Sequence, residues 1–296
     1  MKLKYSTMKI RKAVIPAAGF GTRFLPVTKS QPKEMIPIVD TPVIHYVVEE
    51  AVNSGITDIL LIIGRGKRAI EEYFDRSWEL ERSLEEKGKY ELLKQIQNIT
   101  SMANIHFVWQ KEMLGLGHAV MHARTFVGNE PFAVLLGDTL IEGNNGQPVT
   151  AQLIDVYKKY KGSVVGLEKV LPEMISRYGV IDGEHVEGRV YKAKGFIEKP
   201  SVREAPSDLA IASRYVFNPD IFDFLEKTKP GKNDEIQLTD AMKAMLSEHA
   251  MYGLHFDGKR YDVGNKLDFI KTNLIYGLKT DDIKDELKSW LKTFDF

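Results

Sequence analysis

The chain contains one stretch that decides its fold: Ala13-Val-Ile-Pro-Ala-Ala-Gly19-Phe-Gly21-Thr-Arg23-Phe-Leu-Pro26-Val-Thr-Lys29-Ser-Gln-Pro32-Lys33. Its first six residues are apolar and predict a buried strand. The two glycines that follow predict a loop whose backbone can approach a ligand closely, and whose N–H groups can surround phosphate oxygens. The arginine and lysines behind them supply a planar fork and compact point charges for phosphate. The stretch therefore indicates a strand followed by a nucleoside triphosphate site.

The composition is that of a globular protein. Of its 296 residues, 43% are hydrophobic and 28% are charged, which suffices for a sizeable core. Lys+Arg and Asp+Glu both total 41, and this balance argues against a nucleic acid or an anionic membrane as partner. The chain has no cysteine, so disulfides and thiolate sites are excluded. No apolar run reaches membrane-spanning length, and Met1–Met8 has no signal-peptide core. We therefore expect a soluble cytoplasmic protein.

Strands and helices alternate through the first half of the chain. Asp40-Thr-Pro42 predicts a helix start, with a capping Asp or Thr and a proline in the first turn. The apolar runs at 58–64 and 131–138 are typical of strands in a parallel sheet. The segment 67–100 is charge-rich and predicts helices with an apolar stripe, formed by Leu80, Leu84, Leu92, Leu93 and Ile96. We expect an α/β fold, with a Rossmann-like open mixed, mostly parallel sheet flanked by helices.

The second half is richer in short strands. Segments 178–181, 189–191 and 195–198 predict strands joined by glycine-containing turns. We expect one domain over residues 1–296, because no linker of domain-separating length occurs. Within it we assign the nucleotide-binding half to about 9–150 and a second half with a small β-rich insert to about 151–262. C-terminal helices follow at about 263–296.

Two common phosphate-binding motifs do not fit the opening stretch. A dinucleotide fingerprint requires a third glycine where this chain has Phe24, and an acid where the second strand ends in Gly64-Arg65. Arg65 could meet a 2′-phosphate, so this alternative stays open on the motif alone. A Walker-type phosphate loop is excluded, because its lysine-containing pattern does not occur.

The stretch instead resembles the signature of the sugar-1-phosphate nucleotidyltransferases, G-x-G-T/S-R-x-x-P-x-T-K followed by P-K-x-M/L-x-P. Here the signature runs from Gly19 to Lys29 and from Pro32 to Pro37. Further blocks resemble the bacterial branch that uses UTP and glucose 1-phosphate. They are Gly64-Arg-Gly-Lys67, Gln110-Lys-Glu-Met-Leu-Gly-Leu-Gly-His-Ala119, Phe132-Ala-Val-Leu-Leu-Gly-Asp138, Arg177-Tyr-Gly-Val180, Gly195-Phe-Ile-Glu-Lys-Pro200 and Asp234-Glu-Ile-Gln-Leu-Thr-Asp240. The likeness extends from about residue 9 to about residue 280.

The resemblance implies that UTP and glucose 1-phosphate give UDP-glucose and pyrophosphate. A sugar-phosphate oxygen attacks the α-phosphorus in line with the leaving pyrophosphate, with Mg²⁺ as cofactor. The nucleophile is already ionised, so positioning and electrostatic stabilisation should supply most of the catalysis. The family also implies a homodimer or homotetramer.

The resemblance assigns roles to the phosphate and base contacts. Arg23 and Lys33 are expected to hold the leaving pyrophosphate, with Lys29 a weaker candidate. The expected nucleotide-binding residues are Ala18, Gly19, Gly21, Gln110, Gly115 and Gly117. His118 is expected to start a helix rather than to catalyse.

Metal and sugar contacts come from later blocks. Asp138 follows a buried strand and is expected to bind the metal with Asp262, although Asp262 could also be a turn residue. Lys199 is expected to hold the sugar phosphate. The expected sugar contacts are Gly179, Glu198, Lys199 and Arg214. Glu198 and Lys199 can meet one ligand only if their strand ends there, since neighbouring strand side chains face opposite ways.

Three positions depart from the family pattern. Thr139 stands where a second acid is usual, Ser213 where a glycine is usual, and Asn265 where the residue varies. They leave open the same chemistry with another base or sugar, such as dTTP or galactose 1-phosphate. They also leave open a weakly active regulatory paralogue that binds nucleotide sugars.

Overall fold

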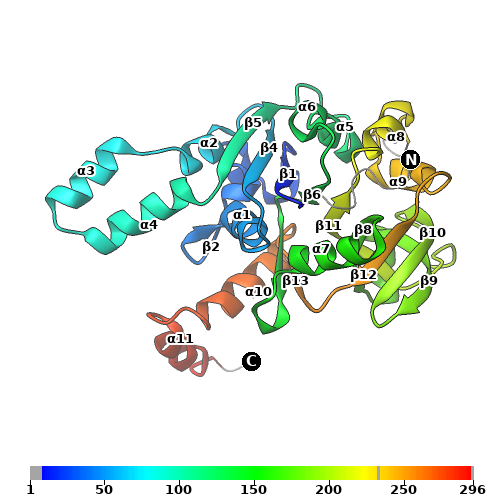
Figure 1. The fold of residues 1–296 in the computed structure, drawn as a ribbon. Coiled ribbons are helices and arrows are strands. Elements are labelled where there is room, and N and C mark those ends of the chain that lie inside the picture. Colours follow the sequence, from blue (N-terminus) through cyan, green and yellow to red (C-terminus); the bar gives the residue numbers. More distant parts are fainter. Residues whose placement is uncertain (1–8, 232–233, 295–296) are drawn as a thin grey trace.

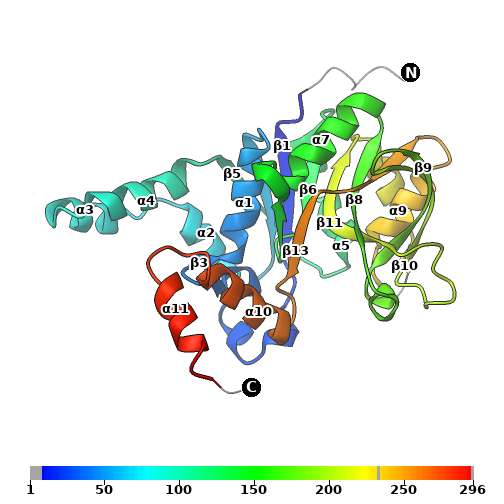
Figure 2. The same ribbon diagram turned by 90° about the horizontal axis from the view of Figure 1, so that it is seen from below.

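The computed structural model describes residues 9–231 and 234–294; the segment 1–8, where we expected no signal peptide, lies outside the described residues. A nine-stranded mixed sheet forms the centre, in the order β5-β4-β1-β6-β11-β8-β12-β10-β9 (Figure 1). Helices lie along both faces of the sheet (Figures 1 and 2). The expected α/β class is therefore confirmed.

The first half of the chain forms the parallel part of the sheet. Its strands are β1 (Lys12–Ala17), β4 (Asp58–Ile63), β5 (Asn104–Trp109) and β6 (Phe132–Leu135). β1 pairs in parallel with both β4 and β6, and β4 pairs in parallel with β5. The carboxyl ends of these strands therefore meet at one edge, where open α/β sheets bind ligands.

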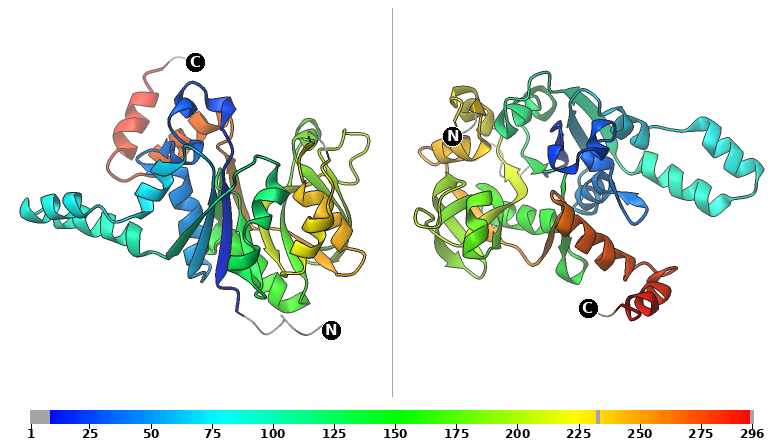
Figure 3. Two further views of the ribbon diagram at one scale, coloured as in Figure 1. Left: turned by 90° about the horizontal axis from the view of Figure 1, so that it is seen from above. Right: turned by 180° about the vertical axis from the view of Figure 1, so that it is seen from behind.

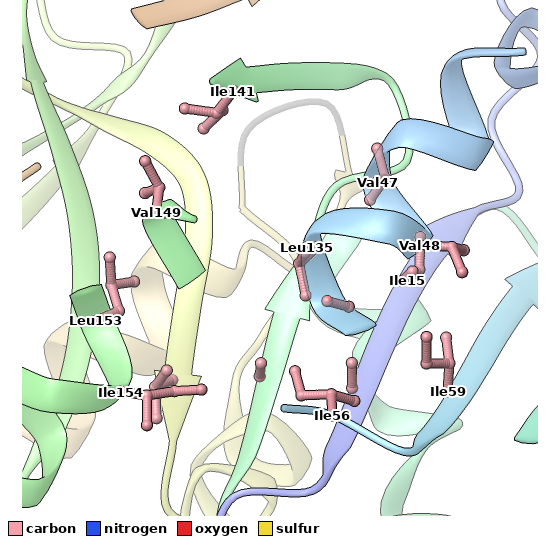
Figure 4. Packing of buried hydrophobic residues seen from close by; sticks show 14 of the residues in the cluster. Ile15, Val47, Val48, Ile56, Ile59, Leu135, Ile141, Val149, Leu153 and Ile154 are labelled. Carbon is pink, nitrogen blue, oxygen red and sulfur yellow. The ribbon is translucent and has the colours of Figure 1, made fainter. Parts of the chain in front are cut away.

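Both faces of β1 are buried, which explains its continuous apolar run. Ala13 and Ile15 belong to a core cluster with α1 (Val43–Asn53) and α7 (Val149–Tyr160), which Figure 4 shows. Val14 belongs to a second cluster on the opposite face. The helices of that face are α5 (Leu116–Met121), α6 (Arg124–Val127), α8 (Ile221–Lys227) and α9 (Leu238–Met245). Burial on both faces fixes the strand in the centre of the sheet.

The second half of the chain joins the same sheet through antiparallel strands. β11 (Leu209–Phe217) pairs antiparallel with β6 and with β8 (Ser163–Lys169), and β12 (Met251–His255) pairs in parallel with β8. β9 (Gly179–Glu187) and β10 (Val190–Glu198) form a hairpin with a bulge between Ala193 and Gly195. The three short strands expected from the sequence are thus two longer strands.

A small two-stranded ribbon adjoins the ligand edge. It consists of β7 (Thr139–Gly143) and β13 (Gly258–Asp262), paired antiparallel so that Thr139 lies opposite Asp262. The pairing places Asp262 beside the residue that follows Asp138. β13 was not predicted from the sequence. The C-terminal helices α10 (Lys266–Gly277) and α11 (Lys284–Leu291) follow it (Figure 2).

The segment between β1 and β4 is built from short turns. Helices η1 (Thr22–Phe24), η2 (Val27–Lys29) and η3 (Lys33–Met35) precede the ribbon of β2 (Pro37–Ile38) and β3 (Thr41–Pro42). α1 begins at Val43 without a side-chain cap. The expected cap by Asp40 or Thr41 is therefore wrong, because Thr41 and Pro42 are extended and pair with β2.

Helices α3 (Trp78–Glu86) and α4 (Tyr90–Ser101) extend away from the body as an arm, and α2 (Arg68–Phe74) precedes them (Figures 1 and 3). Leu80 and Leu92, expected in an apolar stripe, are 47% and 48% exposed. The stripe therefore does not join the core, because the arm leaves the sheet. Among the described residues, no helix combines the length and the apolar character needed to cross a bilayer.

Candidate active site

Two cavities adjoin at the ligand edge of the sheet. The larger has a volume of about 410 Å³ and is lined by the glycine-rich loop, Lys33, Gln110 and Asp138. The smaller has a volume of about 230 Å³ and is lined by Gly179, Glu198 and Lys199. Both are lined by Leu116, Leu136 and Glu235. Two ligands bound in these cavities would therefore lie next to each other.

The glycine-rich loop lines the larger cavity with Ala18, Gly19 and Gly21. Gly21 has φ +66°, and a Cβ atom there would come within 3.0 Å of the Lys33 Cβ. A larger residue at this position would be strained and would displace the lysine. Glycine is thus required for the loop to fold over Lys33.

Lys33 and Asp138 meet across the larger cavity. The Lys33 Nζ lies 2.5 Å from the Asp138 Oδ2, and the two residues come from η3 and from the turn between β6 and β7. Burial alone would raise the pKa of Asp138, but attraction to the Lys33 ammonium and hydrogen bonds from Lys33, the Asp138 backbone and Thr139 together outweigh it and lower the pKa. Burial alone would lower the pKa of Lys33, but Asp138 and Glu34 outweigh it and raise the pKa. Both groups are therefore held in their charged forms.

Asp262 is oriented by two hydrogen bonds. The Tyr178 hydroxyl donates to Oδ2 at 3.1 Å, and the Gly264 N–H donates to Oδ1 at 2.9 Å. The second bond is a turn contact, which is one of the two interpretations of Asp262 from sequence, and the metal role stays a prediction. Asp262 ends β13 opposite Thr139, which places it on the strand adjacent to Asp138.

These two carboxylates fit a hard cation. Mg²⁺ prefers one or two carboxylates completed by water and phosphate oxygens. The residues described here contain no group of three or more His, Cys, Asp or Glu side chains that could hold a metal. The donor set is therefore too small for an all-protein metal cage and suits an ion that a phosphate ligand completes.

Arg23 lines neither cavity. Its side chain is exposed, and its Nη1 lies 3.7 Å from the position that a Cβ of Gly264 would occupy. Its charge also acts to lower the pKa of Lys33. Arg23 therefore stands beside the Asp262–Gly264 turn, close enough to Lys33 for their charges to interact.

The smaller cavity brings Glu198 and Lys199 together. β10 ends at Glu198, and Lys199 has φ +46°, so the alternation of the strand stops there. The Lys199 Nζ lies 3.2 Å from Glu198 Oε1, while the Thr239 hydroxyl donates to Glu198 Oε2 at 2.6 Å. A Cβ at Gly179 would come within 3.1 Å of Glu198 Oε2. The strand end thus exposes both charged groups to one ligand.

Arg214, expected to contact the sugar, lies elsewhere. Its side chain is 1% exposed and pairs at 2.7 Å with Glu50 of α1. Its guanidinium also donates to the carbonyl of Thr139 at 2.8 Å. The neighbouring Ser213 and Tyr215 line the smaller cavity instead, because successive strand residues face opposite ways. The expected sugar contact by Arg214 is therefore wrong.

The base end of the larger cavity contains Gln110 and Gly115. Gly115 has φ +95°, and a Cβ there would come within 2.7 Å of Glu235. Gly117 does not line the cavity; it is buried, and its N–H donates to the Ile236 carbonyl at 2.8 Å. The structure therefore does not bring Gly117 to the cavity as expected, because its backbone packs against Ile236.

A buried ion pair beneath the loop was missed from the sequence. The Lys67 Nζ lies 2.7 Å from Glu34 Oε2, and the two side chains are 6% and 1% exposed. Burial raises the pKa of Glu34 and lowers the pKa of Lys67. Because Glu34 follows Lys33 directly, this pair holds η3 in place. The block Gly64-Arg-Gly-Lys67 marked the lysine but not its partner.

Comparisons with known proteins show what the whole chain is similar to. Residues 12–277 match the family model described as Nucleotidyl transferase. The chain is 53% identical to a UTP–glucose-1-phosphate uridylyltransferase of Staphylococcus haemolyticus, over 97% of this chain and 99% of the relative. A UTP-bound UGPase from Acinetobacter baumannii superposes with a TM-score of 0.90 at 39% identity, covering 97% of this chain and all of that one. A UDP-glucose pyrophosphorylase complexed with UDP-glucose gives 0.85 at 45% identity, covering 92% and 100%.

The buried Arg214 yields a prediction on stability. Arg214→Met should lower the free energy of unfolding by about 3–5 kcal/mol, because it leaves the Glu50 carboxylate buried and unpaired. Urea unfolding of the purified chain measures this change. Arg124→Met is the matched control, because Arg124 pairs with the exposed Asp223 and Glu226 and should change stability by at most about 1 kcal/mol. Equal losses in the two variants would contradict the assignment.

Proposed function

The chain belongs to the nucleotidyl transferase family, and on this premise we propose that it transfers the uridylyl group of UTP to glucose 1-phosphate, giving UDP-glucose and pyrophosphate. The observation that carries the proposal is the pair of adjoining cavities. One is lined by a glycine-rich loop with Lys33 and Asp138, and the other by Glu198 and Lys199. The printed names of the relatives support the choice of UTP and glucose.

The reaction exchanges one bond at the α-phosphorus. A phosphate oxygen of glucose 1-phosphate forms the new bond, and the bond from the α-phosphorus to the oxygen that bridges it to the β-phosphorus breaks. The electron pair of that bond leaves with pyrophosphate. The attacking oxygen carries a negative charge at neutral pH, so no side chain must remove a proton. The protein has to bring two anions together and stabilise the group that leaves.

Each cation near the cavities has a place in this scheme. Lys33 holds the β- and γ-phosphates from within the larger cavity, and Arg23 contacts them from its exposed position beside the Asp262 turn. Lys199 holds the phosphate of the sugar at the junction of the two cavities. Glu198 accepts hydrogen bonds from sugar hydroxyls, and Gly179 leaves room for the ring. Distances of 2.5 Å from Lys33 to Asp138 and 3.2 Å from Lys199 to Glu198 support these roles, because each lysine is oriented before substrate binds.

The nucleotide base lies at the far end of the larger cavity. Ala18 and Gly19 offer backbone groups to it, Gly21 shapes the loop, and Gln110 with Gly115 meets the uracil. Asp138 and Asp262 would hold Mg²⁺ with the phosphate oxygens of UTP. When bound, the ion supplies positive charge that stabilises the charge developing on the phosphate oxygens.

We also propose that the protein works in the cytoplasm as a homodimer or homotetramer. Exposed apolar side chains on the C-terminal helices support assembly, since Leu267 and Ile270 of α10 are 61% and 64% exposed and Trp290 of α11 is 55% exposed. Burying such side chains between subunits would be favourable. Sedimentation of the purified chain measures the assembly state.

Pyrophosphate release over a grid of substrates tests the proposed reaction. UTP, dTTP, CTP and ATP are each combined with glucose 1-phosphate or galactose 1-phosphate, with and without Mg²⁺. We expect the highest kcat/KM for UTP with glucose 1-phosphate, and no turnover without a divalent cation. Release only with dTTP or galactose 1-phosphate would replace the proposed substrates. No release with any pair would favour a binding paralogue.

Asp138→Asn should abolish turnover while the fold persists. The amide lacks the charge that orients Lys33 and that would hold the cation, and losses of this kind commonly exceed about 100-fold in kcat. Steady-state pyrophosphate release measures the loss, and circular dichroism confirms folding. Asp155→Asn is the matched control, because Asp155 lies on the surface of α7. Full activity of Asp138→Asn would remove Asp138 from the site.

Lys199→Ala should mainly impair use of the sugar phosphate. Loss of a charge-assisted hydrogen bond corresponds to roughly a ten- to hundredfold increase in KM for glucose 1-phosphate. The KM for UTP should stay close to that of the wild type. Lys194→Ala, which removes an exposed lysine from the strand that precedes Lys199, should change neither constant. If the KM for UTP rose instead, the assignment of the two cavities would be reversed.

A further inference from the structure

Gln110 is held in one orientation at the base end of the larger cavity. It directly follows β5, is 4% exposed, and lines the cavity. Its Nε2 donates to the Gly115 carbonyl at 3.4 Å and to the ring of His118, with 3.1 Å between Nε2 and Nδ1. Both amide N–H groups of Gln110 therefore donate hydrogen bonds within the protein.

The carbonyl end of the same amide is left for a ligand. Among the described residues no hydrogen bond to Oε1 of Gln110 is found, and none of their fully buried side-chain polar atoms lacks a partner. Oε1 is therefore accessible in the cavity that the side chain lines. A uracil ring carries a proton on N3, whereas N3 of cytosine is an acceptor. A fixed hydrogen-bond acceptor at this place therefore favours uracil and repels cytosine.

We propose that His118 is the positioning residue that fixes the Gln110 amide with its carbonyl toward the base, and that it thereby sets the preference for UTP over CTP. The inference rests on the proposed function, because it assigns the base end of the same site. It goes further by giving a role to a histidine that contacts the glutamine through Nδ1. His118 does not touch the reacting groups.

The surroundings of His118 favour a neutral ring, and a neutral ring with its proton on Nε2 can accept at Nδ1. Burial lowers the pKa of His118, and the neighbouring His122 lowers it further, against the opposing effects of the Glu112 backbone and carboxylate. The neutral ring therefore dominates near pH 8. His122 lies edge-on at 4.7 Å, and its Nδ1–H donates to the His118 carbonyl at 2.9 Å. This contact lies at the C-terminal end of α5 and engages only the backbone of His118, so it leaves the His118 ring free to meet Gln110.

The test compares dissociation constants of UTP and CTP, measured by titration calorimetry at pH 8 on the full-length chain. His118→Leu removes the acceptor at similar size, so Gln110 can turn its amide toward the base. We expect the CTP/UTP ratio of dissociation constants to fall about tenfold or more, the discrimination that one good base contact provides. His118→Asn keeps an acceptor near Nδ1 and should restore most of the ratio. His122→Leu, which leaves the contact with Gln110 in place, should keep it.

Binding separates this inference from the proposed reaction. A wild type that binds UTP no more tightly than CTP, or a His118→Leu variant with the wild-type ratio, would overturn the role of His118 even if pyrophosphate is released. If the wild type binds UTP more tightly than CTP but releases no pyrophosphate, only the proposed reaction is overturned. If His118→Leu does not fold, ¹⁵N NMR of the wild-type His118 ring decides. An unprotonated Nδ1 supports the inference, and a protonated Nδ1 overturns it.

Discussion

The buried ion pair between Arg214 and Glu50 is the constraint on which the ligand edge depends. Neither charge can be buried without the other, because a buried unpaired charge costs several kcal/mol. Glu50 belongs to α1 in the first half of the chain, and Arg214 to β11 in the second. The same guanidinium donates to the carbonyl of Thr139, the residue after Asp138. Folding the two halves around this pair therefore also places Asp138.

Two further ion pairs include residues that line the larger cavity. Lys67 pairs with Glu34 below the loop, and Lys33 pairs with Asp138 at the cavity wall. The deeper pair is almost fully buried and only holds η3. The outer pair is partly exposed, so a triphosphate in the larger cavity can compete with Asp138 for Lys33. Of these two pairs, only the outer one can therefore offer its lysine charge to a substrate in the cavity.

The sequence predicts well whatever depends on local pattern. The apolar run of β1, the glycine loop behind it and the end of β10 at Glu198 follow from periodicity and from residues with restricted backbones. The position of Arg214 could have been predicted as well, since alternation puts 211, 213 and 215 on one face and 214 on the other. Ion pairs between residues distant in the chain, such as Lys67 and Glu34, could not be predicted, because no local pattern in a sequence shows which charges meet. The exposure of Leu80 could not be predicted either, because the helical stripe is apolar whether or not a core covers it.

Two departures from the family pattern, Thr139 and Ser213, prove to be neighbours, with their hydroxyl oxygens 3.3 Å apart. Ser213 has φ +60° within the irregular part of β11, a conformation that costs a non-glycine residue about 1–2 kcal/mol. Hydrogen bonds from the Leu136 N–H and the Arg214 guanidinium to the Ser213 carbonyl, at 3.1 and 3.0 Å, hold it there. Thr139 is 6% exposed, so its side chain belongs to the packing of the ribbon. The second carboxylate that we assign to the cation comes from Asp262, directly opposite Thr139. An acid at position 139 is therefore not needed to give this site two carboxylates, and the two departures affect backbone position more than the charge that faces the substrate.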